Sequence, residues 1–558
     1  MTILGLSLSP HDSSAAIVEN GKVSIAIEEE RLSHVRHCIK YDNSQYNLKS
    51  EAKYFDSNFL NPSIDSLRKK INRFYKYFKQ GNKHIEEQVS MIVGSNLTGT
   101  NVPVDNYINI NHHLAHAAHA FYTSPYTEAA VLVIDGAGDY FDDSFETVSL
   151  YSAHGGSLHL LEKVTGQINH STNTIIALSN SVGVLYQNTA SLCGFGPFGE
   201  GKLMGIASYG KPRYVKKFSK YCVKKDTYYQ IDNIGLYRCI AKTVNRDTGQ
   251  KNIADVASSV QKIINNVVLF YARRIKEVTG HRNLCYAGGV ALNAIANTKI
   301  LEKSGFKRVY IPSAPGDNGV SIGAALYGHY QINGNQKKIS SGVPPVYLGY
   351  KYNDKVLTQA INKYRKYINF EKLRYNKIPP KIAKLLADDN VVAWFQGASE
   401  FGPRALGHRS ILASPLKMST RVRLNKIKSR ESFRPVAPMM TIDDLSDYFY
   451  CPPKVVADSL PYMLFAYTPL NKRITKKIPA AVHVDNTSRL QVLSKNQNSR
   501  LYVLLKEFAK ISETPILINT SFNIKGEPMV ETPKDAIKIF IKSNIDYLVL
   551  NNYLIKRL

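Results

Sequence analysis

The stretch TILGLSLSPHDSSAAIVENGKVSIAI, residues 2–27, has the pattern of a strand, a polar loop and a β-hairpin. Apolar, β-rich segments precede and follow the loop, and Asn20-Gly21 predicts a two-residue turn into a third strand. The loop itself carries His11 and Asp12. Such side chains at a strand end suit contacts with phosphate or with metal-bound water, although an ordinary Asx turn would also explain Asp12.

The same pattern returns later in the chain, as a weak internal repeat of about 120 residues. The run AVLVI, residues 130–134, is typical of a buried strand and ends at Asp135, and two further segments predict a second hairpin. Another short strand pattern ends in the loop APGDNG, which carries Asp317. Actin-like and sugar-kinase-like ATPases hold nucleotide and metal between duplicated cores of this kind. The repeat therefore favours an α/β fold with a duplicated core.

Two glycine-bearing segments predict close approach of the backbone to a ligand. Gly288-Gly289 ends a short strand and precedes a helix pattern, an arrangement that presents backbone N–H groups to a phosphate or nucleotide. The segment GFGPFGEGKLMGIASYG, residues 194–210, has six glycines together with Glu200 and Lys202. It lacks the GKS/T of a Walker A loop, and a flexible loop is the alternative interpretation.

The segment NHHLAHAAHAF, residues 111–121, places histidines among alanines. On a helix, His112 and His116 are one turn apart and project to the same side. Neutral imidazole is the commonest metal ligand, but two histidines need further donors to close a site. Asp135 and Asp317 both follow apolar strands, so we expect the four side chains to form one metal site. Such nitrogen and oxygen donors suit Fe(II), Mn or Zn, with structural histidines as the alternative.

A second domain is predicted after the Gly/Ser/Pro-rich residues 333–347, which divide residues 1–340 from residues 341–558. It begins with the buried-strand run VVAWFQG and continues with cations that have few acids nearby. Guanidinium groups, an ammonium, amides and hydroxyls are the donors that a phosphate requires. The candidates are Arg404, Arg409, Lys428, Arg430, Arg434, Arg489, Asn519, Thr520, Ser521 and Asn523.

The composition is that of an ordinary globular protein. The chain of 558 residues favours two or more domains. We find no apolar stretch of about 18 residues and no signal-peptide pattern. Six dispersed cysteines without a CxxC pair predict reduced thiols in a cytoplasm, and the net charge of +28 suggests an anionic partner. The amphipathic pattern at residues 67–78 predicts a helix with Lys69, Arg73 and Lys76 on a separate face, either solvated or used for docking.

A set of short blocks, in order from residue 5 to about residue 530, resembles one family. The blocks are GLSLSPHDSSAAIV, EEERLS, NHHLAHAAHAF, GEGKLMGIASYG, AGGVALN, APGDNG, FQGASEFGPRALGHRSIL, KSRESFRPVAP, HVDNTSRLQ and NTSFNIKGEP. Together they resemble the ATP-dependent O-carbamoyltransferases of antibiotic and nodulation-factor biosynthesis.

The resemblance implies a fold and a reaction for each domain. The N-terminal domain resembles the duplicated actin-like (ASKHA) domain of the universal tRNA threonylcarbamoylation enzyme, and the C-terminal domain is similar to α+β domains of the YrdC type. The C-terminal domain would form carbamoyl-adenylate from carbamoyl phosphate and ATP with Mg²⁺. The N-terminal domain would pass the carbamoyl group to an acceptor hydroxyl. Adenylation gives a poor electrophile a good leaving group, and a metal can polarise its carbonyl.

The resemblance also implies a role for each matching residue. His112, His116, Asp135 and Asp317 would hold Fe(II) or another divalent metal, and His11 and Asp12 would lie where the acceptor is deprotonated. The adenylate site would be lined by Lys202, Gly288, Gly289 and Asn293. Carbamoyl phosphate and nucleotide would be bound by Arg404, Arg409, Lys428, Arg430, Arg489, Asn519, Ser521 and Asn523. The chain departs from the family pattern at His408 (Asn expected), Asn486 (Gly expected), His34 (Arg expected) and Arg36 (Lys expected).

The acceptor and the partners stay open at this point. Sugar, aminoglycoside, β-lactam and lipo-oligosaccharide hydroxyls all fit. An anionic acceptor such as a nucleotide sugar, or simply a Lys-rich genome, would account for the positive charge. We expect no membrane partner, and the oligomeric state, a homodimer included, is open. The alternative function is a nucleic-acid-directed protein of the tRNA-threonylcarbamoylation type, which the lack of an RNP1 signature, a KH loop and a basic-aromatic stripe disfavours. A nucleotide-binding scaffold without catalysis would predict gaps in the metal set, and the sequence has none.

Overall fold

The computed structural model describes residues 1–9, 11–38, 63–95, 102–168, 178–332, 334, 346–452 and 456–558. They form two compact units. Unit 1 comprises Met1–Glu29, His37–Pro344 and Pro452–Asp458, and unit 2 comprises Glu30–Arg36, Pro345–Cys451 and Ser459–Leu558. The chain therefore passes from one unit to the other at several points along its length. The boundary predicted at residues 333–347 lies outside the described residues except for 334, 346 and 347.

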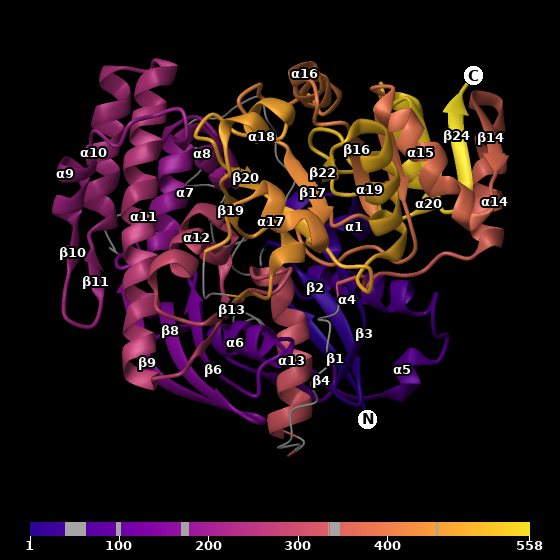
Figure 1. Ribbon diagram of the computed structural model, residues 1–558. Helices are drawn as coiled ribbons and strands as arrows, with labels where there is room; N and C mark the ends of the chain where they lie inside the picture. Colours follow the sequence, from indigo (N-terminus) through magenta and orange to yellow (C-terminus); the bar gives the residue numbers. More distant parts are fainter. Residues whose placement is uncertain are drawn as a thin grey trace. The chain divides into compact units, whose positions relative to one another are not determined.

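The first sheet of unit 1 is built on the N-terminal hairpin (Figure 1). Its strands, in spatial order, are β3 (Lys22–Glu28), β2 (Ser14–Glu19), β1 (Thr2–Ser7), β4 (Val89–Ser95) and β5 (Tyr107–Asn109). The three hairpin strands are antiparallel, whereas β4 is parallel to β1 and β5 is parallel to β4. The predicted turn is confirmed, because Asn20 and Gly21 have φ angles of 49° and 76°.

The second sheet of unit 1 repeats this topology. Its corresponding strands are β9 (Ser157–Gln167), β8 (Ser144–His154), β6 (Glu128–Ile134), β12 (Asn283–Ala287) and β13 (Arg308–Tyr310). Here too the hairpin strands β6, β8 and β9 are antiparallel, and β12 and β13 run parallel to β6. The short strands β7 (Tyr140–Phe141) and β18 (Val456–Ala457) pair with β8 and β13. The predicted α/β fold with a duplicated actin-like core is confirmed.

Two helices, α6 (His112–Tyr122) and α13 (Val320–Tyr327), pack against each other, and α13 lies on the first sheet (Figure 1). Their crossing is close, since a Cβ added to Gly323 would lie 1.9 Å from the carbonyl oxygen of Ala115. The other described helices and strands of unit 1 are α4 (Ile64–Phe78), α5 (Ile85–Gln88), α7 (Val182–Leu192), α8 (Glu200–Ala207), α9 (Val215–Phe218), β10 (Cys222–Lys224), β11 (Tyr229–Ile231), α10 (Asn233–Arg246), α11 (Gln250–Thr279) and α12 (Ala294–Lys303).

Unit 2 is an α+β unit around one mixed sheet. Its strands, in spatial order, are β14 (Ile368–Lys372), β24 (Tyr553–Arg557), β23 (Tyr547–Leu550), β15 (Val392–Phe395), β16 (Arg409–Ala413), β22 (Ile516–Ser521), β17 (Ala437–Thr441) and β21 (Gln491–Leu493). Helices α15 (Ile378–Ala387) and α19 (Ser499–Ser512) pack on it, and their apolar side chains bury Trp394, Leu412 and Leu517. This burial is the main favourable contribution to the stability of the unit.

The other elements of unit 2 flank this sheet. They are α14 (Asp354–Lys363), α16 (Met418–Ile427), α17 (Leu445–Tyr448), β19 (Ala466–Tyr467), α18 (Lys472–Lys477), β20 (Ser488–Arg489) and α20 (Pro533–Lys542). The helix α1 (Glu29–Ser33) begins in unit 1 and ends in unit 2.

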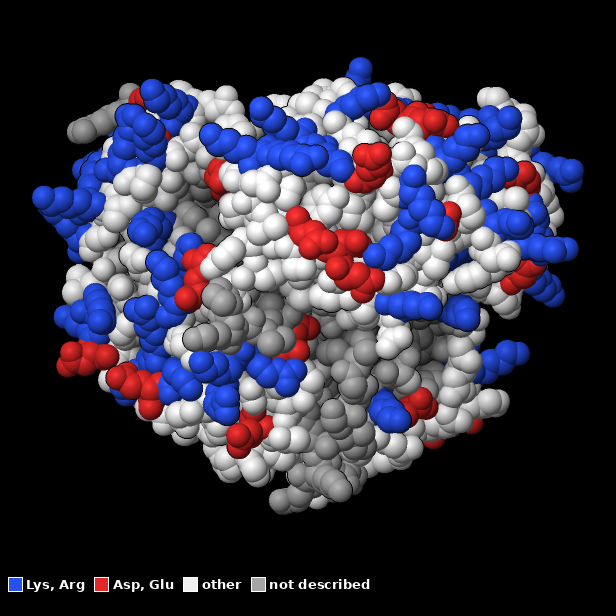
Figure 2. Space-filling model, in the orientation of Figure 1, with Lys and Arg blue, Asp and Glu red and all other residues white. Residues whose placement is uncertain are grey.

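Positively charged side chains are numerous on the face drawn in Figure 2. Lys and Arg occur in many places on this face, with fewer Asp and Glu between them, in keeping with the net charge of +28. None of the helices in the described part of the chain has the length and the apolar composition that a bilayer span requires.

The predicted basic amphipathic helix is α4, and its apolar residues Leu67, Ile71 and Phe74 are buried as expected. The predicted polar face is confirmed for Lys69 and Lys76, which are exposed. Arg73 is half-buried and forms an ion pair with Glu29. Lys70, which the pattern did not assign to that face, is buried with the apolar residues.

Candidate functional site

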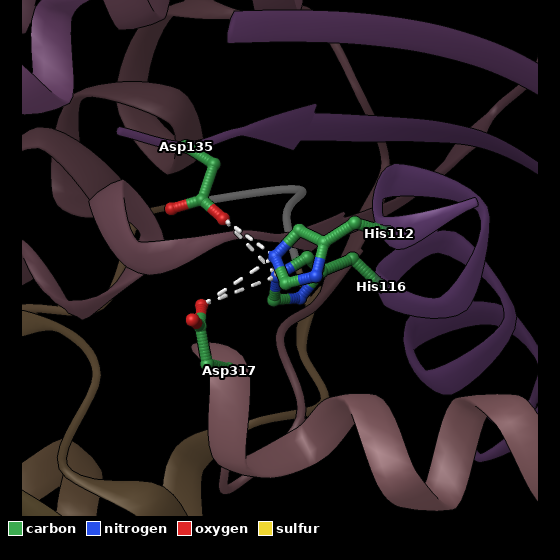
Figure 3. Close-up of side chains that lie close together, drawn as sticks. All are labelled: His112, His116, Asp135 and Asp317. Atoms are coloured by element: carbon green, nitrogen blue, oxygen red, sulfur yellow. Dashed lines mark hydrogen bonds and ion pairs between the residues drawn. The ribbon is translucent and has the colours of Figure 1, made fainter. Parts of the chain in front are cut away.

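The predicted histidine and aspartate donors come together in unit 1 (Figure 3). Helix α6 supplies His112 and His116, the end of β6 leads into Asp135, and the turn after β13 supplies Asp317. Asp135 Oδ2 lies 3.3 Å from His112 Nε2 and 3.1 Å from His116 Nε2. Asp317 Oδ1 lies 3.6 and 3.7 Å from the same two nitrogens. All four side chains are buried, and one donor atom of each lies within 4.8 Å of the others.

Each carboxylate is anchored through its other oxygen. Asp135 Oδ1 accepts hydrogen bonds from the backbone N–H groups of Gly136 (2.8 Å) and Gly289 (3.0 Å). Asp317 Oδ2 accepts a hydrogen bond from the Ser9 hydroxyl at 2.7 Å. Ser95 Oγ lies 3.3 Å from His112 Nδ1. These contacts leave one oxygen of each aspartate and the Nε2 atom of each histidine directed at a common point.

This donor set fits a divalent metal. The two Nε2 atoms lie 3.1 Å apart in a buried cluster of side chains, a separation that requires a proton or a cation between them. Burial lowers the pKa of His112, but the charge of Asp317 and the hydrogen bond to Asp135 raise it to about 10. The cluster therefore stabilises positive charge. Two imidazole nitrogens and two carboxylate oxygens suit Fe(II), Mn or Zn.

The first turn of α6 is held by acids that the sequence did not single out. Asp139 accepts hydrogen bonds from the backbone N–H of His112 (3.1 Å) and from the side chain of Asn111 (3.0 Å). Asn111 also donates to Glu146 Oε2 at 2.7 Å and caps the helix by accepting the N–H of Leu114. A carboxylate at a helix N-terminus is favourable, and here it fixes the backbone that carries His112.

His11 and Asp12 lie beside this cluster, joined by a third residue. Asp12 oxygens lie 3.2 Å from His11 Nδ1 and 2.8 Å from His37 Nδ1, and the Phe198 ring stacks on His37 with a centroid distance of 4.3 Å. His11 Nδ1 is also 3.8 Å from Asp317 Oδ2. Burial lowers the pKa of His11, but the hydrogen bond to Asp12 and the charge of Asp317 raise it to about 9. The family resemblance also makes His37 a candidate ligand, whereas no motif pointed to Phe198.

Several of the residues predicted to line the adenylate site form hydrogen bonds or close contacts with other residues of the protein. Asn293 caps α12 by accepting the N–H of Ala296, and its amide also exchanges hydrogen bonds of 3.1 Å with Gln261. The N–H of Gly289 is held by Asp135, as described above. Lys202 lies half-buried on α8. The close approach that Gly288 permits is to backbone, because a Cβ there would lie 2.2 Å from the carbonyl oxygen of Ile134.

We therefore expect Gly288→Ala to destabilise unit 1 by about 2–4 kcal/mol, since the new methyl group meets rigid backbone and the φ angle of 94° strains any side chain. Thermal unfolding measures the loss. Gly316→Ala is the matched control in the neighbouring loop, because the nearest heavy atoms to its new Cβ would be 3.8 Å away. Equal melting temperatures for the two variants would contradict this account.

Cations gather in unit 2 without matching acids. Burial, and then the charge of neighbouring cations, lowers the pKa of Arg404 and Lys428 well below the usual range. The same causes lower the pKa of Arg430 to about 9 and the pKa of Arg489 to about 10. Beside these cations, Arg434 forms an ion pair with Glu431 at 3.8 Å. Buried guanidinium nitrogens of Arg404, Arg430 and Arg489 have no hydrogen-bond partner in the described structure. A bound oxyanion would satisfy them and relieve their mutual repulsion.

The other residues predicted to bind carbamoyl phosphate and nucleotide fall into two groups. Lys428 Nζ donates to Ser521 Oγ (3.0 Å) and to Asn523 Oδ1 (2.6 Å), so both lie at the cluster. The structure places Arg409 elsewhere: its buried guanidinium donates to backbone carbonyls, including those of Gln396 (2.9 Å) and Gly397 (3.1 Å). Asn519 donates to the carbonyl oxygen of Ala405 and to Gln491. In the described structure these two residues order the loop that carries Arg404.

Comparison with known proteins agrees with this arrangement of two units. The model of the carbamoyltransferase N-terminus matches residues 2–326, and that of the carbamoyltransferase C-terminus matches residues 383–557. The chain belongs to the carbamoyltransferase family. The class of reaction is therefore carbamoyl transfer.

Relatives of this carbamoyltransferase cover nearly all of the chain. An uncharacterised protein of Synechocystis is 31% identical over 100% of the chain and 96% of its own length. The nodulation protein NolNO of Sinorhizobium fredii is 31% identical over 98% of the chain and 79% of its own length. Among solved structures, HypF in a phosphate- and nucleotide-bound form is 16% identical over 60% of the chain and 47% of that protein, with a TM-score of 0.38.

Two departures of this carbamoyltransferase from the family pattern have local explanations. His408 is buried, its Nδ1 lies 2.6 Å from the carbonyl oxygen of Ala398, and its ring stacks on Tyr347 with a centroid distance of 3.5 Å. It is therefore a packing residue of the Arg404 loop. Asn486, which stands where Gly is expected, has a φ angle of 60°, a conformation that Asn tolerates better than most other residues.

Proposed function

We propose that this carbamoyltransferase makes carbamoyl-adenylate from carbamoyl phosphate and ATP in unit 2 and transfers the carbamoyl group to an acceptor hydroxyl in unit 1. The observation that carries the proposal is the cationic cluster of unit 2, whose Arg404, Lys428, Arg430 and Arg489 lack carboxylate partners among the described residues. A substrate pair with several phosphate groups matches that charge.

The first step consumes one water. Carbamoyl phosphate loses inorganic phosphate to water and leaves carbamate, whose oxygen attacks the α-phosphorus of ATP. A bond from that oxygen to phosphorus forms, and pyrophosphate leaves. Arg404 and its neighbouring cations bind the phosphate charge before and during this displacement, where fixed positive charge is most effective. ATP enters with Mg²⁺, and Ser521 and Asn523 orient the Lys428 ammonium in the cluster.

The second step is an acyl transfer. The acceptor oxygen attacks the carbamoyl carbon, the bond to the adenylate oxygen breaks, and AMP leaves. The hydroxyl proton passes to the pair of His11 and Asp12 in the form in which the His11 imidazole is neutral, a general-base contribution of about 10²–10⁴-fold. His112, His116, Asp135 and Asp317 would hold the metal, iron in our assignment, which would polarise the carbamoyl carbonyl as a Lewis acid.

We assign the acceptor to the hydroxyls of small molecules or sugars and place the reaction in the cytoplasm. None of the six cysteines forms a disulfide, which supports a reducing compartment.

The experiment that tests the proposal needs no acceptor. Purified protein loaded with iron is incubated with ATP and Mg²⁺, with and without carbamoyl phosphate, and the release of pyrophosphate and phosphate is followed. Mass spectrometry detects carbamoyl-adenylate. We expect equal amounts of both products, with pyrophosphate release dependent on carbamoyl phosphate. Pyrophosphate release that does not depend on carbamoyl phosphate would refute the proposal that the protein makes carbamoyl-adenylate by itself. So would the absence of release from protein that still binds ATP.

A further inference from the structure

Helix α4 buries a lysine side chain that donates a hydrogen bond to a hydroxyl. Lys70 is 9% exposed and lies among Leu67, Ile71 and Phe74 on the buried face of the helix. Its ammonium donates to Ser13 Oγ at 2.9 Å. The neighbouring carboxylate, Glu29, forms its ion pair with Arg73. Burial lowers the pKa of Lys70, as expected for a cation removed from water.

A buried ammonium is costly, so its position calls for a compensating role. Lys70 reaches the residues of the proposed transfer site through a chain of short hydrogen bonds. Ser13 Oγ in turn donates a hydrogen bond to the carbonyl oxygen of Ser9 at 2.7 Å. The hydroxyl of Ser9 in turn donates to Asp317 Oδ2, also at 2.7 Å. The ammonium is thus linked to a metal-site carboxylate through two serines.

The same contacts hold the loop that carries His11 and Asp12. Ser13 closes this loop on one side, where its carbonyl oxygen also accepts the N–H of Glu29 at 2.9 Å. Asp12 next to it has a φ angle of 50°, a left-handed conformation that Asp adopts more readily than most other non-glycine residues and that fits a tight loop. Ser9 closes the loop on the other side.

We propose that Lys70 is a positioning residue, which holds Ser13 and, through it, Ser9, and thereby places Asp12 and Asp317 for the transfer step. It touches no substrate. The inference deepens the proposed function and rests on it for the role of the site, but the contact chain can be tested by itself.

The decisive variant is Lys70→Met, which replaces the ammonium by an apolar side chain of similar length. Replacing a buried charge by an apolar isostere is often neutral or stabilising, so the melting temperature should stay the same or rise. The loop would lose its anchor. We expect faster hydrogen–deuterium exchange in peptides that contain Asp12 and Ser13, together with about 10-fold weaker binding of Mn²⁺, as when an outer contact of a metal ligand is removed.

Two further variants complete the design. Lys69→Met is the matched control, since Lys69 is the adjacent residue on the same helix and is exposed. It should leave both readouts unchanged. The variant Ser13→Ala removes the hydrogen bond from Lys70 and the one from Ser13 to Ser9, so its effect on exchange should be at least as large as that of Lys70→Met. Adding Lys70→Met to Ser13→Ala should not speed exchange further, because the contact of Lys70 is already lost.

Each outcome decides the proposal. Faster exchange and weaker Mn²⁺ binding in Lys70→Met, with melting unchanged or raised, support it. Exchange in Lys70→Met equal to that of the wild type overturns it, whatever the Mn²⁺ result. If the wild type binds no Mn²⁺, the exchange measurement alone decides. Pyrophosphate release, which we assign to unit 2, should be the same in Lys70→Met and in the wild type. Its absence from the wild type would refute the proposed function and leave the inference on Lys70 to be judged by exchange.

Discussion

The variant Arg404→Met should lower kcat/KM for carbamoyl phosphate, measured by pyrophosphate release, by about 10²–10³-fold, while the protein without bound anions becomes more stable. Its guanidinium has a buried Nε atom without a partner, and its pKa is lowered by burial and by Arg489, Arg434 and Arg36. Removing one cation from this unbalanced cluster relieves repulsion, which we expect to raise the free energy of unfolding by about 1 kcal/mol.

Differential scanning fluorimetry with and without inorganic phosphate separates the two effects. Phosphate should raise the melting temperature of the wild type and leave that of Arg404→Met unchanged. Lys426→Met is the control, because Lys426 is an exposed cation two residues from Lys428. It should behave as the wild type. A phosphate-induced shift of the same size in Arg404→Met would show that this cluster is not the anion site.

The pH dependence has a defined sign. The pKa of Arg430 in the folded protein is about 9 and that of Arg489 about 10, both below the value of an exposed arginine. Above pH 9 the folded cluster loses protons that the unfolded chain still binds, so the stability of the anion-free protein rises with pH there. Phosphate binding needs the protonated cluster. The phosphate-induced shift in melting temperature should therefore shrink between pH 8 and about pH 10.

The second large effect is expected at Asp135. In Asp135→Asn the amide oxygen can still accept the N–H groups of Gly136 and Gly289, so the anchor survives. The NH₂ group then faces His112 and His116 and offers a donor where a metal needs a lone pair. We expect binding of Mn²⁺ or Fe²⁺ to weaken by at least about 100-fold, measured by isothermal titration or by Mn²⁺ electron paramagnetic resonance. Formation of carbamoyl-adenylate should continue, since we assign it to unit 2.

The control for this variant is Asp142→Asn, an exposed acid after the next strand, β7. It removes the same charge without touching the cluster. If both variants bind the metal as the wild type does, the four side chains form a structural hydrogen-bond network and not a metal centre. If both lose it, the effect is one of net charge.

The sequence was most informative where function requires one residue type at a fixed spacing. His112 and His116 had to share a helical face, and Asp135 and Asp317 had to follow strands, so their meeting could be predicted. Ser9, Ser95 and Asp139 could not, because hydroxyls and single acids at loop positions carry no spacing signal.

Other residues show why a suitable side chain is an incomplete guide. Arg409 and Asn519 have the chemistry of phosphate ligands, and in the structure both also donate to backbone carbonyls, contacts that the sequence pattern does not reveal. Asn293 likewise caps a helix. The buried position of Lys70 could not be predicted from the pattern of the basic helix, because its neighbours in sequence do not reveal that it contacts Ser13.

The exchange of chain segments between the units also follows from contacts that are distant in sequence. Strand β18 joins the second sheet of unit 1 beside β13, and Asp458 after it pairs with Arg308, 150 positions earlier. In return, Arg31 is buried in unit 2 and donates to the carbonyl oxygen of Gly402 at 3.0 Å.

This exchange has a consequence for synthesis on the ribosome. The N-terminal unit cannot complete its sheet edge until β18 has left the exit tunnel, by which time most of unit 2 has been translated. A nascent chain stopped near residue 344 would expose the unpaired edge of β13, and a fragment started there would lack the Arg31 segment. Separately expressed halves should therefore aggregate, whereas the intact chain folds as one product of translation.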